Sequence, residues 1–286
     1  MIKIPQLNSE GFTKYSTYQE FAKTFDIDGW TKFDLGVCSD GVNHVYGLMY
    51  GDTTKPTIFI EGSLHGGHEW RCGHWLLQFA KIISNPSGLP QAELIYQMTS
   101  KLSFFIIPCA NPFGYENNSY VNANGVNLNR NFDLYWDEFV GQEGTPQYKG
   151  PAPFSEPESR MVRDAVTELK PILFIAAHTW GGYNGAMIEV DVPSRKYEVH
   201  VSDVRDSIRL TIDRDDILHR AVGPRPTSAA WAGNQLDRSG RSTMGIVLEP
   251  GSEEVEKEQA RIGINGLMLF SLYALKRFED GTLRHF

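Results

Sequence analysis

The sequence is poor in cysteine and contains no long apolar run. Its three cysteines, Cys38, Cys72 and Cys109, are odd in number and widely spaced, which argues against a disulfide framework and a cysteine-rich zinc site. The longest apolar runs, such as residues 172–177, are far shorter than the roughly 20 residues of a membrane helix. The N-terminus lacks the apolar core and cleavage site of a secretory signal. We therefore expect a cytoplasmic protein, or one released without a recognisable signal peptide.

Basic residues are also in deficit. The 27 Lys and Arg residues face 35 Asp and Glu residues, which gives a net charge of −8. Nucleic acids and anionic membranes bind proteins mainly through Lys and Arg, so we expect neither as a partner. In contrast, 16 Phe, 12 Tyr and 6 Trp supply ample surface for a buried core. The composition favours a soluble catalyst or binding protein and leaves its substrate open.

The hydrophobic pattern alternates between strands and helices. The expected strands are residues 57–63, 103–108, 172–177 and 243–248, and the expected helices are residues 69–84, 155–169 and 253–278. We expect a break in the last helix near Gly263 or Gly266. We also expect Ser155 to cap the N-terminus of the helix over residues 155–169. Such alternation predicts an α/β fold with a largely parallel sheet covered by helices on both faces.

No repeat or flexible linker divides the chain, so we expect one domain over residues 1–286. Residues 33–38 and 44–50 flank a Ser-Asp-Gly turn and predict a hairpin at one edge of the sheet. This hairpin and an N-terminal helix occupy residues 1–56, ahead of the first core strand.

Charged or ligating side chains follow three of the expected strands directly. His65 and Glu69 follow the first, His178 follows the third, and Glu249 follows the fourth. Ligand sites of open α/β sheets lie beyond the carboxyl ends of strands, so these side chains can meet. Two histidines and one glutamate form a ligand set for catalytic zinc, and a further carboxylate can accept a proton from its water.

A segment rich in amides, residues 122–132, contains a second candidate site. Its Asn129 and Arg130 can hold a carboxylate, since the planar guanidinium of arginine pairs with carboxylates in a bidentate manner.

Together these motifs resemble the zinc metallocarboxypeptidases of the carboxypeptidase A-like family. Residues 64–70, Leu-His-Gly-Gly-His-Glu-Trp, resemble the His-x-x-Glu-Trp zinc segment, and residues 125–132, Gly-Val-Asn-Leu-Asn-Arg-Asn-Phe, nearly repeat another family motif. Four more segments follow the family's order: residues 111–115, 150–158, 176–182 and 246–250. The resemblance spans about two thirds of the chain, from residue 57 to residue 251.

The resemblance implies a phosphorylase/hydrolase-like fold, a three-layer sandwich whose mixed sheet has about eight strands. It implies one Zn²⁺ ion held by His65, Glu69 and His178, with Glu249 as the catalytic general base. The implied activity is a hydrolase, a zinc carboxypeptidase that cuts the C-terminal bond of peptides, including γ-linked or cell-wall peptides.

The implied partner is a peptide with a free C-terminal carboxylate, which Asn129 and Arg130 would bind. Two alternatives remain: a deacylase of N-acyl amino acids related to aspartoacylase, and an inactive binding domain with the same fold.

The chain departs from the family pattern at the zinc segment. Three residues separate His65 from Glu69 where the family has two, although a glycine of Gly66-Gly67 can absorb the extra residue. His68 is therefore a rival ligand.

Other departures concern the groups around the reaction. Asn127 replaces the usual Asp of the Gly-Val-Asp-Leu motif, and Tyr120 stands where bacterial relatives carry an arginine that stabilises the oxyanion. Arg71, Arg238 and Arg241 are candidates to supply that charge. By position, Asn234 is expected to shape the side-chain pocket, and Trp231 to close it.

Overall fold

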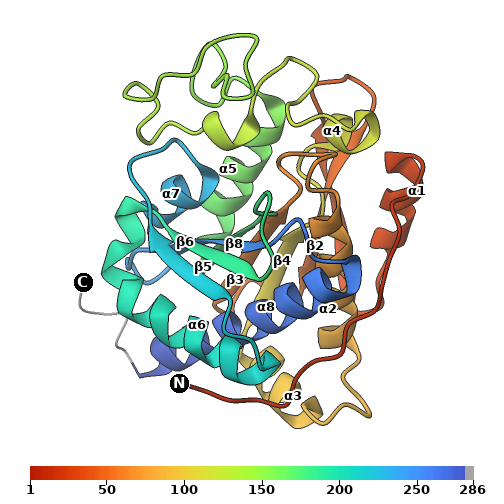
Figure 1. Ribbon diagram of the computed structural model, residues 1–286, viewed down its shortest axis with the longest axis vertical. Coiled ribbons are helices and arrows are strands. Elements are labelled where there is room, and N and C mark those ends of the chain that lie inside the picture. Colours follow the sequence, from red (N-terminus) through yellow and green to blue (C-terminus); the bar gives the residue numbers. More distant parts are fainter. Residues whose placement is uncertain (281–286) are drawn as a thin grey trace.

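The computed structural model describes residues 1–280, whose strands form one eight-stranded mixed sheet (Figure 1). The strands lie in the order β1-β2-β4-β3-β5-β8-β6-β7. Their bounds are β1 Trp30–Val37, β2 His44–Tyr50, β3 Thr57–Gly62, β4 Ser103–Ile107, β5 Leu173–Ala177, β6 Ala186–Val190, β7 Ile217–Ala221 and β8 Met244–Pro250. The four expected core strands and the edge hairpin β1–β2 are confirmed. Residues 281–286 of the expected domain lie outside the described residues.

Four parallel strands, β4, β3, β5 and β8, form the centre of the sheet. Their side chains alternate between two apolar layers: Ile58 and Ile60 of β3 join one core cluster, and Phe59 joins the other. Burial on both faces explains why these strands have near-continuous apolar sequences. The outer strands make the sheet mixed, because β6 runs antiparallel to β8, as do β1 to β2 and β2 to β4.

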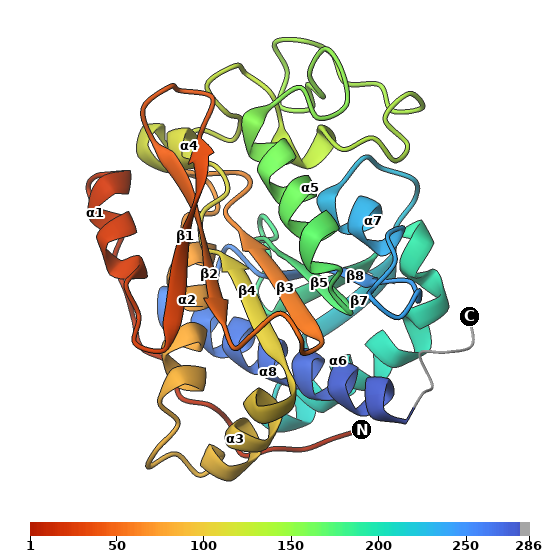
Figure 2. The same ribbon diagram turned by 180° about the vertical axis from the view of Figure 1, so that it is seen from behind.

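Helices cover both faces of the sheet. The long helices α2, α6 and α8 pack on one face, and α5 and α7 pack on the other (Figures 1 and 2). The helix bounds are α1 Tyr18–Ala22, α2 Arg71–Ser84, α3 Ala92–Lys101, α4 Pro112–Asn117, α5 Pro157–Leu169, α6 Glu198–Ile212, α7 Ser228–Gly233 and α8 Glu256–Glu279. This arrangement confirms the three-layer α/β fold. No helix among residues 1–280 has the length and apolar composition needed to cross a bilayer.

Helix α5 begins two residues later than expected, and the prediction of Ser155 as its cap is wrong. Glu156 stands at the cap position. The Ser155 hydroxyl instead donates to Glu156 Oε1 at 2.7 Å and accepts from Asn131 Nδ2 at 2.9 Å. Ser155 therefore ties the helix start to the long segment that precedes it.

Helix α8 runs without a break for 24 residues, so the expected interruption at its glycines is also wrong. Both glycines are contact points. A Cβ at Gly263 would lie 2.7 Å from the Trp75 ring of α2, and one at Gly266 would lie 2.9 Å from Leu248 of β8. These glycines let the helix approach α2 and the sheet closely, which outweighs their poor helix propensity.

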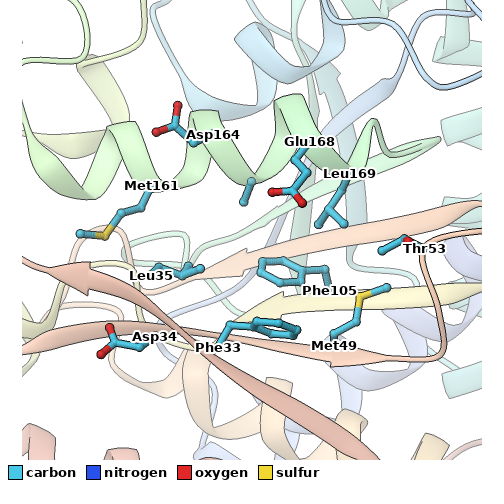
Figure 3. A pocket seen from close by; sticks show the side chains of 11 residues that line it. Phe33, Asp34, Leu35, Met49, Thr53, Phe105, Met161, Asp164, Glu168 and Leu169 are labelled. Carbon is cyan, nitrogen blue, oxygen red and sulfur yellow. The ribbon is translucent and has the colours of Figure 1, made fainter.

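A groove of about 390 Å³ lies between the β1–β2 hairpin and α5 (Figure 3). Phe33, Leu35 and Phe105 are among its apolar side chains, and Asp164 and Glu168 line it from α5. None of the polar side chains that follow the strand ends line this groove, so it is separate from the candidate site.

We expect Gly263→Ala to lower the free energy of unfolding by about 1–2 kcal/mol, because overpacking against the buried Trp75 ring outweighs the gain in helix propensity. Urea unfolding measures the change. Gly223→Ala is the matched control, since no atom lies within 4 Å of its added Cβ. A Gly263→Ala variant more stable than the parent would contradict this packing.

Candidate active site

The turn between β3 and α2 carries His65 and Glu69. Gly66 has a φ of 41°, in the left-handed region, and a Cβ there would lie 2.4 Å from Gly114 Cα of α4. A Cβ at Gly67 would lie 2.2 Å from Asn118 Cα. Any residue larger than glycine at these two positions would clash with the backbone of α4 and its C-cap. The Gly66-Gly67 pair therefore accommodates the additional residue between His65 and Glu69.

This turn brings His65 and Glu69 together with His178, which follows β5. Their ligand atoms all lie within 4.8 Å of one another, and all three side chains are buried. Glu69 Oε1 lies 2.9 Å from His65 Nδ1, and Glu69 Oε2 lies 2.8 Å from His178 Nδ1. His68 is exposed and lies outside this cluster, and its ring packs edge-to-face with the ring of Tyr120. The geometry therefore favours Glu69 over His68 as the third ligand.

The three side chains fit a catalytic zinc ion. Two imidazole nitrogens and a carboxylate are its usual protein ligands, and they leave a position for water. The second ring nitrogen of each histidine also has a hydrogen-bond partner. His65 Nε2 lies 3.2 Å from Asn127 Oδ1, and His178 Nε2 lies 3.2 Å from Asn129 Nδ2. Such outer contacts orient metal-binding histidines. Asn127 thus supplies an orienting contact without the charge of an aspartate.

The cluster attracts positive charge. Burial alone would lower the pKa of His178, but the Glu69 carboxylate outweighs it and raises this pKa to about 9. Burial would raise the pKa of Glu69, and the two histidines instead hold it well below its ordinary value. A proton on His178 competes with a metal ion, so we expect zinc affinity to weaken as the pH falls.

Glu249 lies near the end of β8 and lines a cavity together with His65, Glu69 and His178. Burial raises the pKa of its carboxyl group to about 7, with His178 opposing the shift and Glu189 and Glu69 adding to it. Its side chain accepts no hydrogen bond from residues 1–280 in this structure. A free carboxylate whose pKa lies near neutrality is suited to take up and return a proton.

Asn129 and Arg130 lie in a short 3₁₀ helix, Leu128–Arg130, and line the same cavity as the candidate zinc ligands. Asn129 Oδ1 accepts from the backbone N–H of Ser228 at 3.0 Å. Arg130 Nε donates to Gln147 Oε1 at 2.9 Å, and its Nη1 donates to the Asn129 carbonyl at 2.6 Å. The remaining Nη2 has no partner among the described residues, which leaves a positioned guanidinium edge for an anionic ligand.

Tyr120 also lines the cavity, which has a volume of about 430 Å³. Its ring stacks on His65 with the ring centroids 3.9 Å apart. Burial raises the pKa of the Tyr120 phenol to about 12. The hydroxyl therefore stays protonated and can donate a hydrogen bond.

The structure does not bring the other predicted contributors to this cavity. The Arg71 guanidinium binds Glu256 at 2.8 Å, and Asn234 is exposed at the end of α7. The remaining candidates are engaged elsewhere: Arg238 with backbone carbonyls, Arg241 with Asp237, and Trp231 with Phe132 and Phe154. For the candidates between β7 and β8, the distance in sequence from Glu249 did not predict which side chains face the cavity.

Sequence reasoning missed three charged residues that line the cavity. Glu189 lies on β6, Arg220 on β7, and Arg225 in the loop that leads to α7. They belong to no motif, and Arg220 is 31 residues from the glutamate that it binds. The pairing of β6 with β7 brings Glu189 and Arg220 together, and the loop after β7 adds Arg225.

Known proteins resemble this chain. A model of the family described as zinc carboxypeptidase matches residues 40–197. A carboxypeptidase B of Astacus astacus is 31% identical over 155 residues, which cover 47% of this chain and 48% of that protein. The chain thus matches about half of that relative's length.

Two solved structures share the fold. Thrombin activatable fibrinolysis inhibitor superposes with a TM-score of 0.74 at 16% identity, covering 91% of this chain and 77% of the other. A carboxypeptidase A from Helicoverpa armigera superposes with a TM-score of 0.71 at 20% identity, covering 92% and 72%.

We expect His65→Ala or His178→Ala to abolish stoichiometric zinc binding, and His68→Ala to leave one zinc ion per chain. The physical reason is that His68 lies outside the buried cluster. Elemental analysis of the purified, dialysed variants gives the metal content. Loss of zinc from His68→Ala together with its retention in His65→Ala would contradict this ligand set.

Proposed function

The chain belongs to the zinc carboxypeptidase family, whose model matches residues 40–197, and on this premise we propose that it hydrolyses the C-terminal bond of peptides with the help of one Zn²⁺ ion. One observation carries the proposal. A single cavity joins the two-histidine, one-glutamate cluster with Glu249 and with the Asn129–Arg130 pair. Metal ligands, a proton acceptor and a carboxylate-binding edge are what hydrolysis at a free C-terminus requires.

Glu249 is the general base of the proposed reaction. His65, Glu69 and His178 would hold the zinc ion, which would act as a Lewis acid toward the carbonyl and the water. Glu249 takes one proton from the attacking water as the oxygen adds to the scissile carbonyl carbon. It then returns the proton to the leaving amine as the C–N bond breaks, so the carboxylate is regenerated. Tyr120 donates a hydrogen bond to the developing oxyanion.

Arg130 and Asn129 restrict cleavage to the last bond. The α-carboxylate of the substrate binds the free edge of Arg130, beside the side-chain amide of Asn129. This fixed anchor places only the terminal peptide bond next to Glu249. Neither the deacylase nor an inactive domain accounts better for the family match and the intact ligand set.

The free carboxylate of the substrate provides the first test. We expect zinc-loaded protein to release single C-terminal residues from a peptide and to leave the same peptide untouched when its C-terminus is amidated. Mass spectrometry follows both reactions. Equal rates on the two peptides would refute the carboxypeptidase proposal.

Glu249→Gln tests the base in the same assay. We expect it to lower kcat by at least about 100-fold, because the amide cannot accept the proton of the attacking water. Zinc content checks that the variant retains its site. The matched control is Glu253→Gln, a nearby carboxylate that does not line the cavity.

The pH profile gives a further prediction. The rate must rise with pH as Glu249 loses its proton. The surrounding groups raise its pKa from 4.5 to about 7, and the charge of bound zinc would lower it again. We therefore expect the acid limb of kcat/KM to have its midpoint between these two values. A rate that rises toward acid across this range would contradict the role of Glu249.

A further inference from the structure

A cluster of Glu189, Arg220 and Arg225 extends the cavity beyond the zinc ligands. Glu189 and Arg220 are register partners on the parallel strands β6 and β7. Arg220 donates to Glu189 Oε1 through Nε at 2.8 Å and also through Nη2, and Arg225 Nη2 donates to Glu189 Oε2 at 2.6 Å. Both oxygens of the single carboxylate are therefore engaged by the two arginines.

The sheet places this cluster next to the reacting groups. Strand β6 is antiparallel to β8, with Met187 opposite Glu249 and Glu189 opposite Val247. Side chains two residues apart on a strand share a face, so Glu189 projects from the same face of the sheet as Glu249. All three cluster residues line the same cavity as Asn129 and Arg130.

The cluster has more donors than the protein satisfies. Arg225 Nε is buried without a hydrogen-bond partner among the described residues. Asp191 Oδ2 accepts from the Thr227 hydroxyl at 2.8 Å, and Asp191 Oδ1 is buried without a hydrogen-bond partner in the described part of the chain. Burial raises the pKa of Asp191 to about 6, and the charge of Arg225 opposes this rise.

The side chains that line the cavity favour an anion over the other classes of ligand. Besides Glu249 and the zinc ligands, the charged residues are three arginines and one glutamate. Burial and the charge of Arg225 lower the pKa of Arg130, so the two guanidiniums repel each other. A basic side chain would meet the same repulsion, and an apolar one would leave the buried Arg225 Nε unsatisfied.

We propose that this cavity selects peptides whose last residue is acidic. The α-carboxylate binds Asn129 and Arg130, and the side-chain carboxylate binds Arg225. Arg220, whose side chain is 48% exposed, lies at the mouth and adds to the attraction. This selectivity rests on the proposed carboxypeptidase function and names its substrate class.

Peptides that differ only in a final Glu or Gln provide the test, because the two side chains match in shape and differ in charge. We expect kcat/KM to be about 10- to 100-fold higher for Glu, as charged hydrogen bonds contribute that much. A peptide ending in Lys should be cleaved more slowly than either. Cleavage of all three at equal rates would overturn the selectivity while leaving the carboxypeptidase function intact.

Two substitutions should move the Glu-to-Gln ratio in opposite directions. Arg225→Gln should bring it toward one, and Glu189→Gln should raise it, because it frees both guanidiniums. Arg163→Gln is the matched control outside the cavity, on α5, where Arg163 pairs with Asp164. An equal loss for both peptides in folded Arg225→Gln would assign Arg225 to the reaction itself and overturn the proposal.

Binding measurements separate this inference from catalysis. Calorimetry with free glutamate and glutamine reports the subsite even if no peptide is cleaved. We expect tighter binding of glutamate to the zinc-loaded protein and loss of this difference in Arg225→Gln. Absence of cleavage with such binding would refute the carboxypeptidase function alone, and equal binding of both amino acids would refute the acidic subsite.

Discussion

The shared carboxylate of Glu69 is the interaction on which the rest of the site depends. Its two oxygens contact Nδ1 of His65 and of His178, residues carried by the ends of two different strands. A buried carboxylate is costly unless it is paired, and here both partners are also proposed metal ligands. The carboxylate therefore holds the two ring nitrogens close to one position, and its negative charge is one that a zinc ion would balance.

Strand direction then determines what surrounds that position. The parallel strands β3, β5 and β8 end at one edge and bring His65, His178 and Glu249 together. Strand β6 runs antiparallel to β8, so Glu189 lies opposite Val247, two residues before Glu249, and lines the same cavity. The reaction groups thus stand at the ends of strands of one direction, and Glu189 lies on a strand of the opposite direction in the same sheet.

Local sequence predicted the elements better than it predicted their contacts. The four core strands, the edge hairpin and the helices α2, α5 and α8 were predictable because their apolar periodicity is local, whereas α6 was not predicted. Ser155 and Gly263 were misread for a common reason. Each has a strong local preference, for capping or for helix breaking, which a distant partner overrides: Asn131 for Ser155 and the Trp75 ring for Gly263.

The sequence by itself was enough to predict the proposed metal cluster and its general base, because His65, Glu69, His178 and Glu249 stand directly at the ends of recognisable strands. Only the tertiary structure decided which other charges face the substrate. It directs Arg71 to Glu256 and brings Arg225 into the cavity. The direction of a long charged side chain depends on partners far away in the chain, and only the folded sheet makes those partners neighbours.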